Sequence, residues 1–562
     1  MYIKESRSRR NGRVHKTYQI VESYRDENGK VRQRILLHLG PAHKFLEKDI
    51  DTLINGLLRI KGLRLEDVTQ EADAAYRFGQ IWALMYLWKE LKISQAIARQ
   101  RRKRNIQYDL EAHLRALVFN RLDDPSSKLG LIRWLEEVYL PGIRREEIRY
   151  EYLLRAMDFL IEHKRAIENA IARRLLTIFD RELKLCFYDL TSTYFEAEAS
   201  LEADDIRQFG YSRDGRPDRE QIVVGVVMTE DGLPIAHYVF PGNTADRATL
   251  QEVMQDIRSR FGAEEITLVA DKGMISSRNL AFLLDSGFGF ILGESPRQSR
   301  VAREVVREAQ RARREQAPEA EVFLYETEKT RPVQFVNPST GKVEKREVVL
   351  RYIASYRQDR AERHHRTRAR RIAEALEEIE RMQNSALATE DRYPQILGYL
   401  RRKHLSRFFT VRPGSERVHV VPREEELAFE TEADGWALLV TPDRTIPKEE
   451  AVERYGELKY VEHGFLELKH SLELRPNFHW TEKRIRAHVM VCFLAFQLAV
   501  LFEKRLEHLR ISWQRAMQKL RKIHVIEWSR DGRKVRALVH ANREQLDLFR
   551  AVGAKRPTLM DL

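Results

Sequence analysis

The stretch YGELKYVEHGFLELK at residues 455–469 predicts a helix with a mixed face. Residues three and four apart share one side of a helix. That side carries one carboxylate and one ammonium among apolar groups, and its members are Tyr455, Leu458, Glu462, Phe465 and Lys469. Glu462 is either a carboxylate at the rim of an ordinary amphipathic helix or one member of an acidic site. The second interpretation requires further acids elsewhere in the chain.

The composition describes a large, basic, globular protein. The 562 residues are 43% hydrophobic and 33% charged, which is enough for several domains with buried cores. The formal net charge of +14 favours a phosphate-rich partner such as nucleic acid. The two cysteines, Cys186 and Cys492, lie in apolar runs. They exclude a cysteine zinc site, argue against a disulfide framework and are consistent with a reducing cytosol.

No segment predicts insertion into a membrane. The N-terminal MYIKESRSRR lacks the apolar segment of a secretory signal. The most apolar helix, residues 489–502, is too short to span a bilayer and carries Gln497. We therefore expect this helix to be buried in the protein core.

The N-terminal third combines a small β-meander with a basic helical domain. Residues 1–44 hold β-rich runs around a turn, and residues 45–180 are helical by period. The sequence RQRRKRN, starting at residue 99, has five basic residues in seven, so Arg101, Arg102 and Lys103 form either a DNA-contacting loop or a solvated turn. We expect residues 45–180 to bind DNA.

From residue 181 the pattern changes to buried strands. The predicted order over residues 181–294 is β-β-β-α-β-α-β, and the first and fourth strands end in Asp189 and Asp271. An aspartate after a strand is often only a turn residue. In this strand order, however, the two aspartates together favour an acidic site over two unrelated turns.

Residues 295–445 interrupt this core with polar, arginine-rich and β-like segments. We expect them to form an insertion with its own small β structure, including the β-like residues 427–435, and a long basic helix. Residues 357–371 hold seven arginines against two acids. This helix either binds DNA through residues such as Arg366 and Arg370 or is a solvated arm.

Three acids are set apart by this organisation. Carboxylates of Asp189, Asp271 and Glu462 that converge from separate elements repel each other unless a cation lies between them. Such hard oxygen ligands suit Mg²⁺ or Mn²⁺, and two ions about 3.5–4 Å apart stabilise the attacking and leaving oxygens of a phosphodiester. Lys469, two helical turns and about 10 Å beyond Glu462, either holds a neighbouring phosphate or is a surface lysine paired with Glu462 or Glu473.

The three acidic segments resemble, in this order, the motifs of bacterial insertion-sequence DDE transposases. They are FYDLTSTYFE at residues 187–196, LVADKGMIS at residues 268–276 and Y-x2-L-x3-E-x6-K at residues 455–469. The group resembled has a third motif called YREK and a β-rich insertion before the final glutamate. Further similar segments are PGNTAD at 241–246, DPSSKLGLIRWLEE at 124–137 and ELRPNFHWTEKRIRAHVMVCFLAFQL at 473–498.

The resemblance implies an α/β protein with an RNase H-like catalytic core. That core is a mixed five-stranded sheet with helices, interrupted by the β-rich insertion and preceded by the N-terminal helical domain. Its parts are then residues 181–294 and the last helices at 446–510, and a C-terminal tail of helix, charged hairpin and short helix follows at 511–562.

The resemblance also assigns roles to residues of this chain. Asp189, Asp271 and Glu462 become the catalytic acids that bind two Mg²⁺ or Mn²⁺ ions, and Tyr455 and Lys469 match the flanking residues that lie beside DNA. The arginine of the motif is replaced by Leu458. Lys459 is next to it but lies about 100° around the helix, so it is an imperfect substitute.

The leading hypothesis is a transposase that binds the terminal inverted repeats of its element, hydrolyses the DNA ends and joins the 3′-hydroxyl to target DNA. The alternatives are a stand-alone metal-dependent nuclease and a non-catalytic DNA-binding regulator. The basic insertion argues against the first alternative, and the three intact acids argue against the second. We expect a homodimer on double-stranded DNA in the bacterial cytoplasm, associated with the nucleoid, with no nucleotide cofactor and no membrane.

Overall fold

The structure is a computed structural model, and it describes residues 2–10, 13–26, 30–41, 72–102, 105–196, 205–262, 265–336, 340, 342–385, 387–530 and 533–561. Two compact units make up the chain. The first combines Met1–Ala75 with Val525–Val539, and the second combines Tyr76–His524 with His540–Leu562.

The first unit holds the predicted β-meander. Its strands β1 (Tyr2–Arg10), β2 (Arg13–Arg25) and β3 (Val31–Pro41) form one antiparallel sheet in this order. The strands β15 (His524–Arg530) and β16 (Arg533–Leu538) form the antiparallel hairpin predicted in the C-terminal tail. Residues 45–71 of the predicted helical domain lie outside the described residues. The chain passes from one unit to the other within β4 (Ala74–Arg77).

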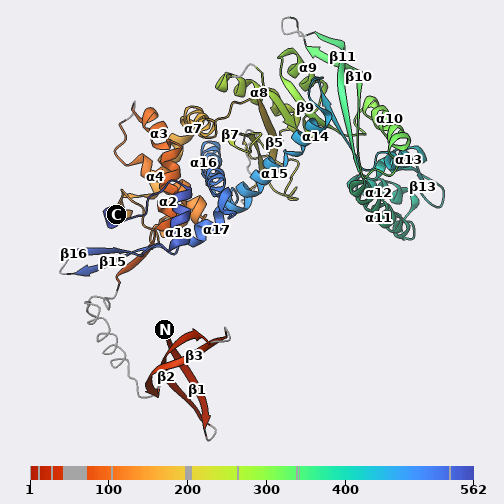
Figure 1. Cartoon of the computed structure of the whole chain (residues 1–562). Helices are drawn as coiled ribbons and strands as arrows, with labels where there is room; N and C mark the ends of the chain where they lie inside the picture. Colours follow the sequence, from red (N-terminus) through yellow and green to blue (C-terminus); the bar gives the residue numbers. More distant parts are fainter. Residues whose placement is uncertain are drawn as a thin grey trace. The chain divides into compact units, whose positions relative to one another are not determined.

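The second unit begins with the predicted helices. They are α2 (Gly79–Glu90), α3 (Ile93–Arg101), α4 (Leu110–Asp123), α5 (Lys128–Trp134), the short η3 (Arg145–Glu147), α6 (Tyr150–Glu162) and α7 (Lys164–Ile178). The long helix α16 (Glu482–Leu506) packs against α2, α4 and α6 (Figure 1). Among the described residues, one helical stretch, Glu482–Leu509, is long and apolar enough to cross a membrane, and 89% of its most apolar window is buried inside the protein. This burial confirms the prediction of a core helix.

The predicted β-β-β-α-β-α-β order is confirmed. Its elements are β5 (Leu185–Tyr194), β6 (Gln221–Thr229), β7 (Pro234–Pro241), α8 (Asp246–Phe261), β8 (Thr267–Ala270), the short η4 (Lys272–Met274), α9 (Ser277–Asp285) and β9 (Gly289–Glu294). In space these strands follow the order β7-β6-β5-β8-β9. The strands β5, β8 and β9 are parallel to one another, whereas β6 and β7 run antiparallel to their neighbours.

The sheet has eight strands instead of the expected five. Three strands of the insertion, β10 (Val322–Val336), β11 (Val343–Arg357) and β14 (Trp436–Thr441), extend it beyond β9, which gives the order β10-β11-β14-β9-β8-β5-β6-β7 (Figure 1). The expectation of a separate β structure therefore holds only for β12 (Phe409–Arg412) and β13 (His419–Pro422). The apolar β14 pairs with β9, because it covers backbone groups that would otherwise form an open sheet edge.

The insertion also contributes helices. They are α10 (Arg300–Gln316), the predicted long basic helix α11 (Gln358–Gln383), α12 (Thr389–Arg402), the short η5 (Ser406–Phe408) and α13 (Glu424–Glu432). The β-like interpretation of residues 427–435 is wrong, because most of this segment belongs to α13. Three glutamates in the first turn of α13 stabilise the helix through its dipole.

The two faces of the sheet carry different helices. Side chains alternate along a strand. Cys186, Tyr188 and Leu190 of β5 belong to the apolar core that includes α8, α9 and α10. Asp189 therefore lies on the opposite face. On that face α14 (Lys448–Gly456) contacts β8 and β9, and α15 (Lys459–Leu466) contacts β5 and β6.

The remaining elements are η6 (Glu467–Ser471), η7 (Glu507–Leu509), α17 (Trp513–Leu520), α18 (Arg543–Ala551) and η8 (Leu559–Asp561).

Candidate active site

The stretch 455–469 does not form the single helix predicted. The helix α14 ends at Gly456, α15 begins at Lys459, and the last residues form the π-turn η6. The break arises from a tight turn, in which the Leu458 amide donates to the carbonyl of Tyr455 at 3.2 Å. The π-turn widens the end, where the Leu472 amide donates to the Glu467 carbonyl at 2.9 Å. Tyr455, Glu462 and Lys469 therefore do not lie on one face of a continuous helix. Such π-turns often mark functional sites.

Asp189 and Asp271 occupy neighbouring positions on two parallel strands. Tyr188 of β5 is paired with Ala270 of β8, the last residue of that strand, so each aspartate comes directly after a paired position. Adjacent strands lie about 4.8 Å apart. Asp271 directly follows its strand, as predicted. Asp189 does not end its strand, because β5 continues to Tyr194 in antiparallel pairing with β6.

The electrostatics of this pair is that of two like charges held together. Burial, together with the negative charges of Asp271 and Asp246, raises the pKa of Asp189 to about 7. The Leu190 amide, which donates to Asp189 Oδ1 at 2.7 Å, and the Arg213 guanidinium lower that pKa without cancelling the effect. Two carboxyl groups are therefore held close together in a buried position, where like charges repel each other.

Tyr455 links the end of α14 to this pair. Its hydroxyl donates a hydrogen bond to Asp271 Oδ1 at 2.9 Å. Burial and the charges of Asp271, Asp189 and Glu462 raise the pKa of Tyr455, so the phenol stays protonated and remains a donor. The ring crosses β9 at Gly293, where an added Cβ would lie only 2.2 Å from the Tyr455 hydroxyl oxygen. A glycine is therefore needed at this close approach.

Glu462 is exposed on α15 and acts on Tyr455 electrostatically. The structure thus brings Asp189, Asp271 and Tyr455 together, with Glu462 on the helix above the same face. Within the described ranges of the chain, no three His, Cys, Asp or Glu side chains are gathered as a ready-made metal site. The metal-binding roles of the three acids stay predictions.

A fourth acid, Asp246, adjoins the site and was not singled out from the sequence. It is the first residue of α8, and its Oδ1 accepts a hydrogen bond from Arg213 Nη2. An added Cβ on Gly273 would lie 3.0 Å from Asp246 Oδ2, so the segment after Asp271 passes close to this carboxylate. The PGNTAD segment, which ends at Asp246, was the available signal.

Lys469 is buried and pairs with Asp214, so pairing with Glu462 or Glu473 is not observed. Its Nζ donates to Asp214 Oδ1 at 2.7 Å, and Arg475 Nη1 lies 2.8 Å from the other carboxylate oxygen. Burial lowers the pKa of Lys469, and the Asp214 carboxylate opposes this. This contact was not predictable from the sequence, because 255 residues separate the partners.

The other predicted DNA-binding residues lie on exposed surfaces. Leu458 is buried, and Lys459 lies over the ring of Tyr460, with its Nζ 5.5 Å from the ring centroid. Arg101 and Arg102 are exposed at the end of α3, and Arg366 and Arg370 are exposed on α11. Lys103 lies outside the described residues. The described contacts do not join these side chains to Asp189, Asp271 or Glu462, and their DNA-binding roles stay predictions.

The strand order β7-β6-β5-β8-β9, with paired aspartates on its parallel strands, defines an RNase H-like fold with an acidic site. The family model of the transposase DDE domain matches residues 197–498, over half of the chain. That of the IS1634 family transposase N-terminal domain matches residues 3–68. The chain therefore belongs to the insertion-sequence DDE transposases. The DDE match contains Asp271 and Glu462 and begins after Asp189. A comparison with curated proteins finds no match.

Proposed function

We propose that this transposase binds the terminal inverted repeats of its insertion sequence, hydrolyses the DNA at the element ends and joins the freed 3′-hydroxyl to target DNA. The observation that carries the proposal is that Asp189 and Asp271 directly follow the paired residues Tyr188 and Ala270 of two adjacent parallel strands. Burial, with the charge of Asp271 added, raises the pKa of Asp189, and a divalent cation would favour the charged form of both carboxyl groups.

The donor set fits Mg²⁺ or Mn²⁺, because it consists of carboxylates. Asp189 and Asp271 would hold the metal, and Glu462 would complete the set from α15. When bound, two such ions activate the attacking oxygen and stabilise the leaving oxygen of a phosphodiester. Tyr455 contributes by holding one oxygen of Asp271 and fixing the orientation of that carboxylate. Arg213 offsets the charge of the nearby Asp246.

The DNA is proposed to approach along basic groups beside the acids. Lys469 and Arg475 share Asp214, and both Arg475 and Arg216 lie over the ring of Tyr194, at 5.2 and 5.1 Å from its centroid. A phosphate that reaches this cluster competes with Asp214 for its cations. Because transposition joins two element ends, we propose a homodimer on double-stranded DNA, acting in the bacterial cytoplasm.

The test is cleavage of a labelled duplex that carries the element's own end, in the presence of Mg²⁺. Wild type is compared with Glu462→Gln and with Glu453→Gln, a control that makes the same change at an exposed position of α14. We expect metal-dependent nicking at the element boundary for wild type and the control, and loss of nicking for Glu462→Gln. Equal cutting by all three proteins would remove Glu462 from the site.

A further inference from the structure

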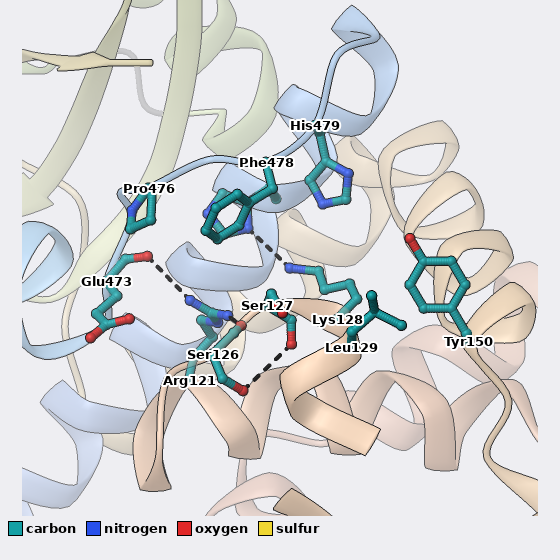
Figure 2. A pocket seen from close by; sticks show the side chains of 11 residues that line it. Arg121, Ser126, Ser127, Lys128, Leu129, Tyr150, Glu473, Pro476, Phe478 and His479 are labelled. Carbon is teal, nitrogen blue, oxygen red and sulfur yellow. Dashed lines mark hydrogen bonds between the residues drawn. The ribbon is translucent and has the colours of Figure 1, made fainter. Parts of the chain in front are cut away.

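A cavity of about 570 Å³ lies away from the acids, between the start of α5 and residues 473–480, which precede α16 (Figure 2). Its wall carries four nitrogen-bearing side chains: Arg121 of α4, Lys128 of α5, His479 and, at the start of α16, His488. The rim is apolar and exposed, with Phe478 63% and Tyr150 38% exposed. The proposed chemistry at the acids uses none of these residues.

The two strongest cations of this pocket are buried without a carboxylate partner. Arg121 is 4% exposed and Lys128 is 7% exposed. Arg121 donates to two backbone carbonyls, that of Glu473 at 3.2 Å and that of Ser126, and Lys128 Nζ lies 3.2 Å from His488 Nδ1. Across the described chain, no carboxylate forms a salt bridge with either cation. Figure 2 shows the Glu473 carboxylate pointing away from Lys128.

Burial and the neighbouring positive charges shift the pKa values of these groups in the same direction. Burial and the charge of Arg121 lower the pKa of Lys128 to about 7. Burial and the charge of Lys128 lower the pKa of His479 to about 3. A buried cation without a counter-charge destabilises a fold, and a bound anion removes that penalty. The cluster therefore has the electrostatic character of an anion site.

A buried network elsewhere in the same unit shows how the chain stabilises its other internal cations. Glu168 accepts from Lys164 at 3.0 Å, contacts Arg260 at 2.8 Å and lies 2.7 Å from His237 Nδ1. There a carboxylate is built into the fold. The pocket lined by Arg121 and Lys128 differs, because its acid Glu473 acts on Arg121 without forming an ion pair with either cation. An anion from outside would therefore add a charge that the described lining does not pair directly with these cations.

We propose that this cationic pocket binds a phosphate group of the DNA strand, with the neighbouring sugar or base against the exposed Phe478 and Tyr150. The inference rests on the proposed function, because it takes DNA as the substrate. The pocket is also joined to the segment after Lys469. Arg121 holds the carbonyl of Glu473, and His488 Nε2 lies 3.1 Å from the carbonyl of Leu474. A phosphate in the pocket would thus hold DNA beside the segment that carries Lys469.

The first measurement uses inorganic phosphate as the probe and thermal unfolding of the full chain, without divalent ions. We expect phosphate to raise the unfolding temperature of wild type and of Lys89→Met, a control at an exposed lysine of α2. We expect Lys128→Met to need at least about tenfold more phosphate for the same shift. Without phosphate, Lys128→Met unfolds at the same or a higher temperature than wild type, which shows that the variant folds.

The second measurement is the affinity for the element-end duplex at several salt concentrations, again without divalent ions. We expect Lys128→Met to bind about tenfold more weakly and to reduce the slope of log affinity against log salt by about 1, as for one lost phosphate contact. Bound duplex should also abolish the stabilisation of wild type by inorganic phosphate.

The two measurements together distinguish a DNA phosphate from free inorganic phosphate as the ligand of the pocket. Stabilisation by inorganic phosphate with unchanged DNA affinity would mean that free phosphate is the ligand and would overturn the DNA proposal. Weaker DNA binding with an unchanged salt slope would also overturn it, because only packing would have been lost. Neither measurement depends on cleavage, so a failure here leaves the Glu462→Gln experiment to decide the proposed function.

Discussion

At the acidic site, Asp189 and Asp271 hold two negative charges on neighbouring strands, and in the cationic pocket Arg121 and Lys128 hold two positive charges on neighbouring helices. In each region the pKa of one group is shifted to about 7. Burial is the main cause in both, and it raises the pKa of the Asp189 carboxyl and lowers the pKa of the Lys128 ammonium. The regions are therefore built alike with opposite sign. For each region we propose a ligand of the opposite charge, a divalent cation at the acids and a phosphate in the pocket.

The buried network around Glu168 differs from both. Lys164, His237 and Arg260 surround this carboxylate and, against the effect of burial, hold its pKa below the usual range. Burial, with Lys164 second, lowers the pKa of His237 to about 4, so the ring is neutral near pH 7. A network that satisfies its own charges is structural, whereas a cluster of like charges indicates a binding site.

The largest effect is expected from Asp189→Asn, which breaks the acidic site. The substitution keeps an oxygen that accepts from the Leu190 amide but removes one negative charge. We expect the rate of Mg²⁺-dependent cleavage of an element end to fall by at least about 1,000-fold, because this charge holds the proposed metal. The unfolding temperature without metal should stay equal or rise, because the repulsion from Asp271 disappears.

The control for this substitution is Asp285→Asn, which makes the same change at an exposed residue that ends α9. It should leave both the cleavage rate and the unfolding temperature unchanged. Cleavage by Asp189→Asn at the wild-type rate would show that the pair with Asp271 is not the reaction centre.

The acidic site was the more predictable of the two regions. Asp189 and Asp271 each follow an apolar run, and strand periodicity reveals such runs. Their common register was not predictable, because it depends on how the chain through β6, β7 and α8 returns to place β8 beside β5. The extension of the sheet was missed for a related reason. The apolar sequence of β14 predicts a buried strand, but it does not show that this strand pairs with β9.

The cationic pocket was not predictable in this way. Arg121 and Glu473 are 352 residues apart, and Lys128 and His488 are 360 residues apart. No local period connects positions so distant, and Arg121 lies on a helix that is buried nearly all round. The break in the stretch 455–469 could not be predicted from the sequence either. The apolar residues keep nearly the spacing of a continuous helix, although a tight turn and a π-turn interrupt it.

A smaller effect, confined to the geometry of the acidic site, is expected from Gly293→Ala. The new Cβ would lie 2.2 Å from the Tyr455 hydroxyl oxygen and would force the phenol away from Asp271. We expect cleavage to fall about 10- to 100-fold through the lost orientation of Asp271. Affinity for element-end DNA measured without metal should stay within about twofold of wild type.

The matched control is Gly456→Ala at the end of α14, where an added Cβ meets nothing within 4 Å. It should cleave as wild type does. If Gly293→Ala also cleaves at the wild-type rate, then the hydrogen bond from Tyr455 does not position Asp271 for the reaction. If both variants lose activity equally, the loss does not depend on the contact between Gly293 and Tyr455, and the specific role of Gly293 is contradicted.

The smallest effect is a difference in pH dependence that compares the two regions directly. The pKa of Asp189 is raised in the folded state to about 7, so between about pH 4 and 7 the folded chain binds more protons than the unfolded chain. This contribution to the free energy of unfolding falls as pH rises through that window.

The pKa of Lys128 is lowered to about 7, so between about pH 7 and 10 the unfolded chain binds more protons, and stability rises with pH. In urea unfolding without metal or phosphate, Asp189→Asn should flatten only the acidic limb and Lys128→Met only the alkaline limb, each by about 1.4 kcal/mol for every unit of pKa shift. If the free energy of unfolding depends on pH in the same way for wild type and both variants, neither Asp189 nor Lys128 has a shifted pKa. The comparison between the two regions would then be wrong.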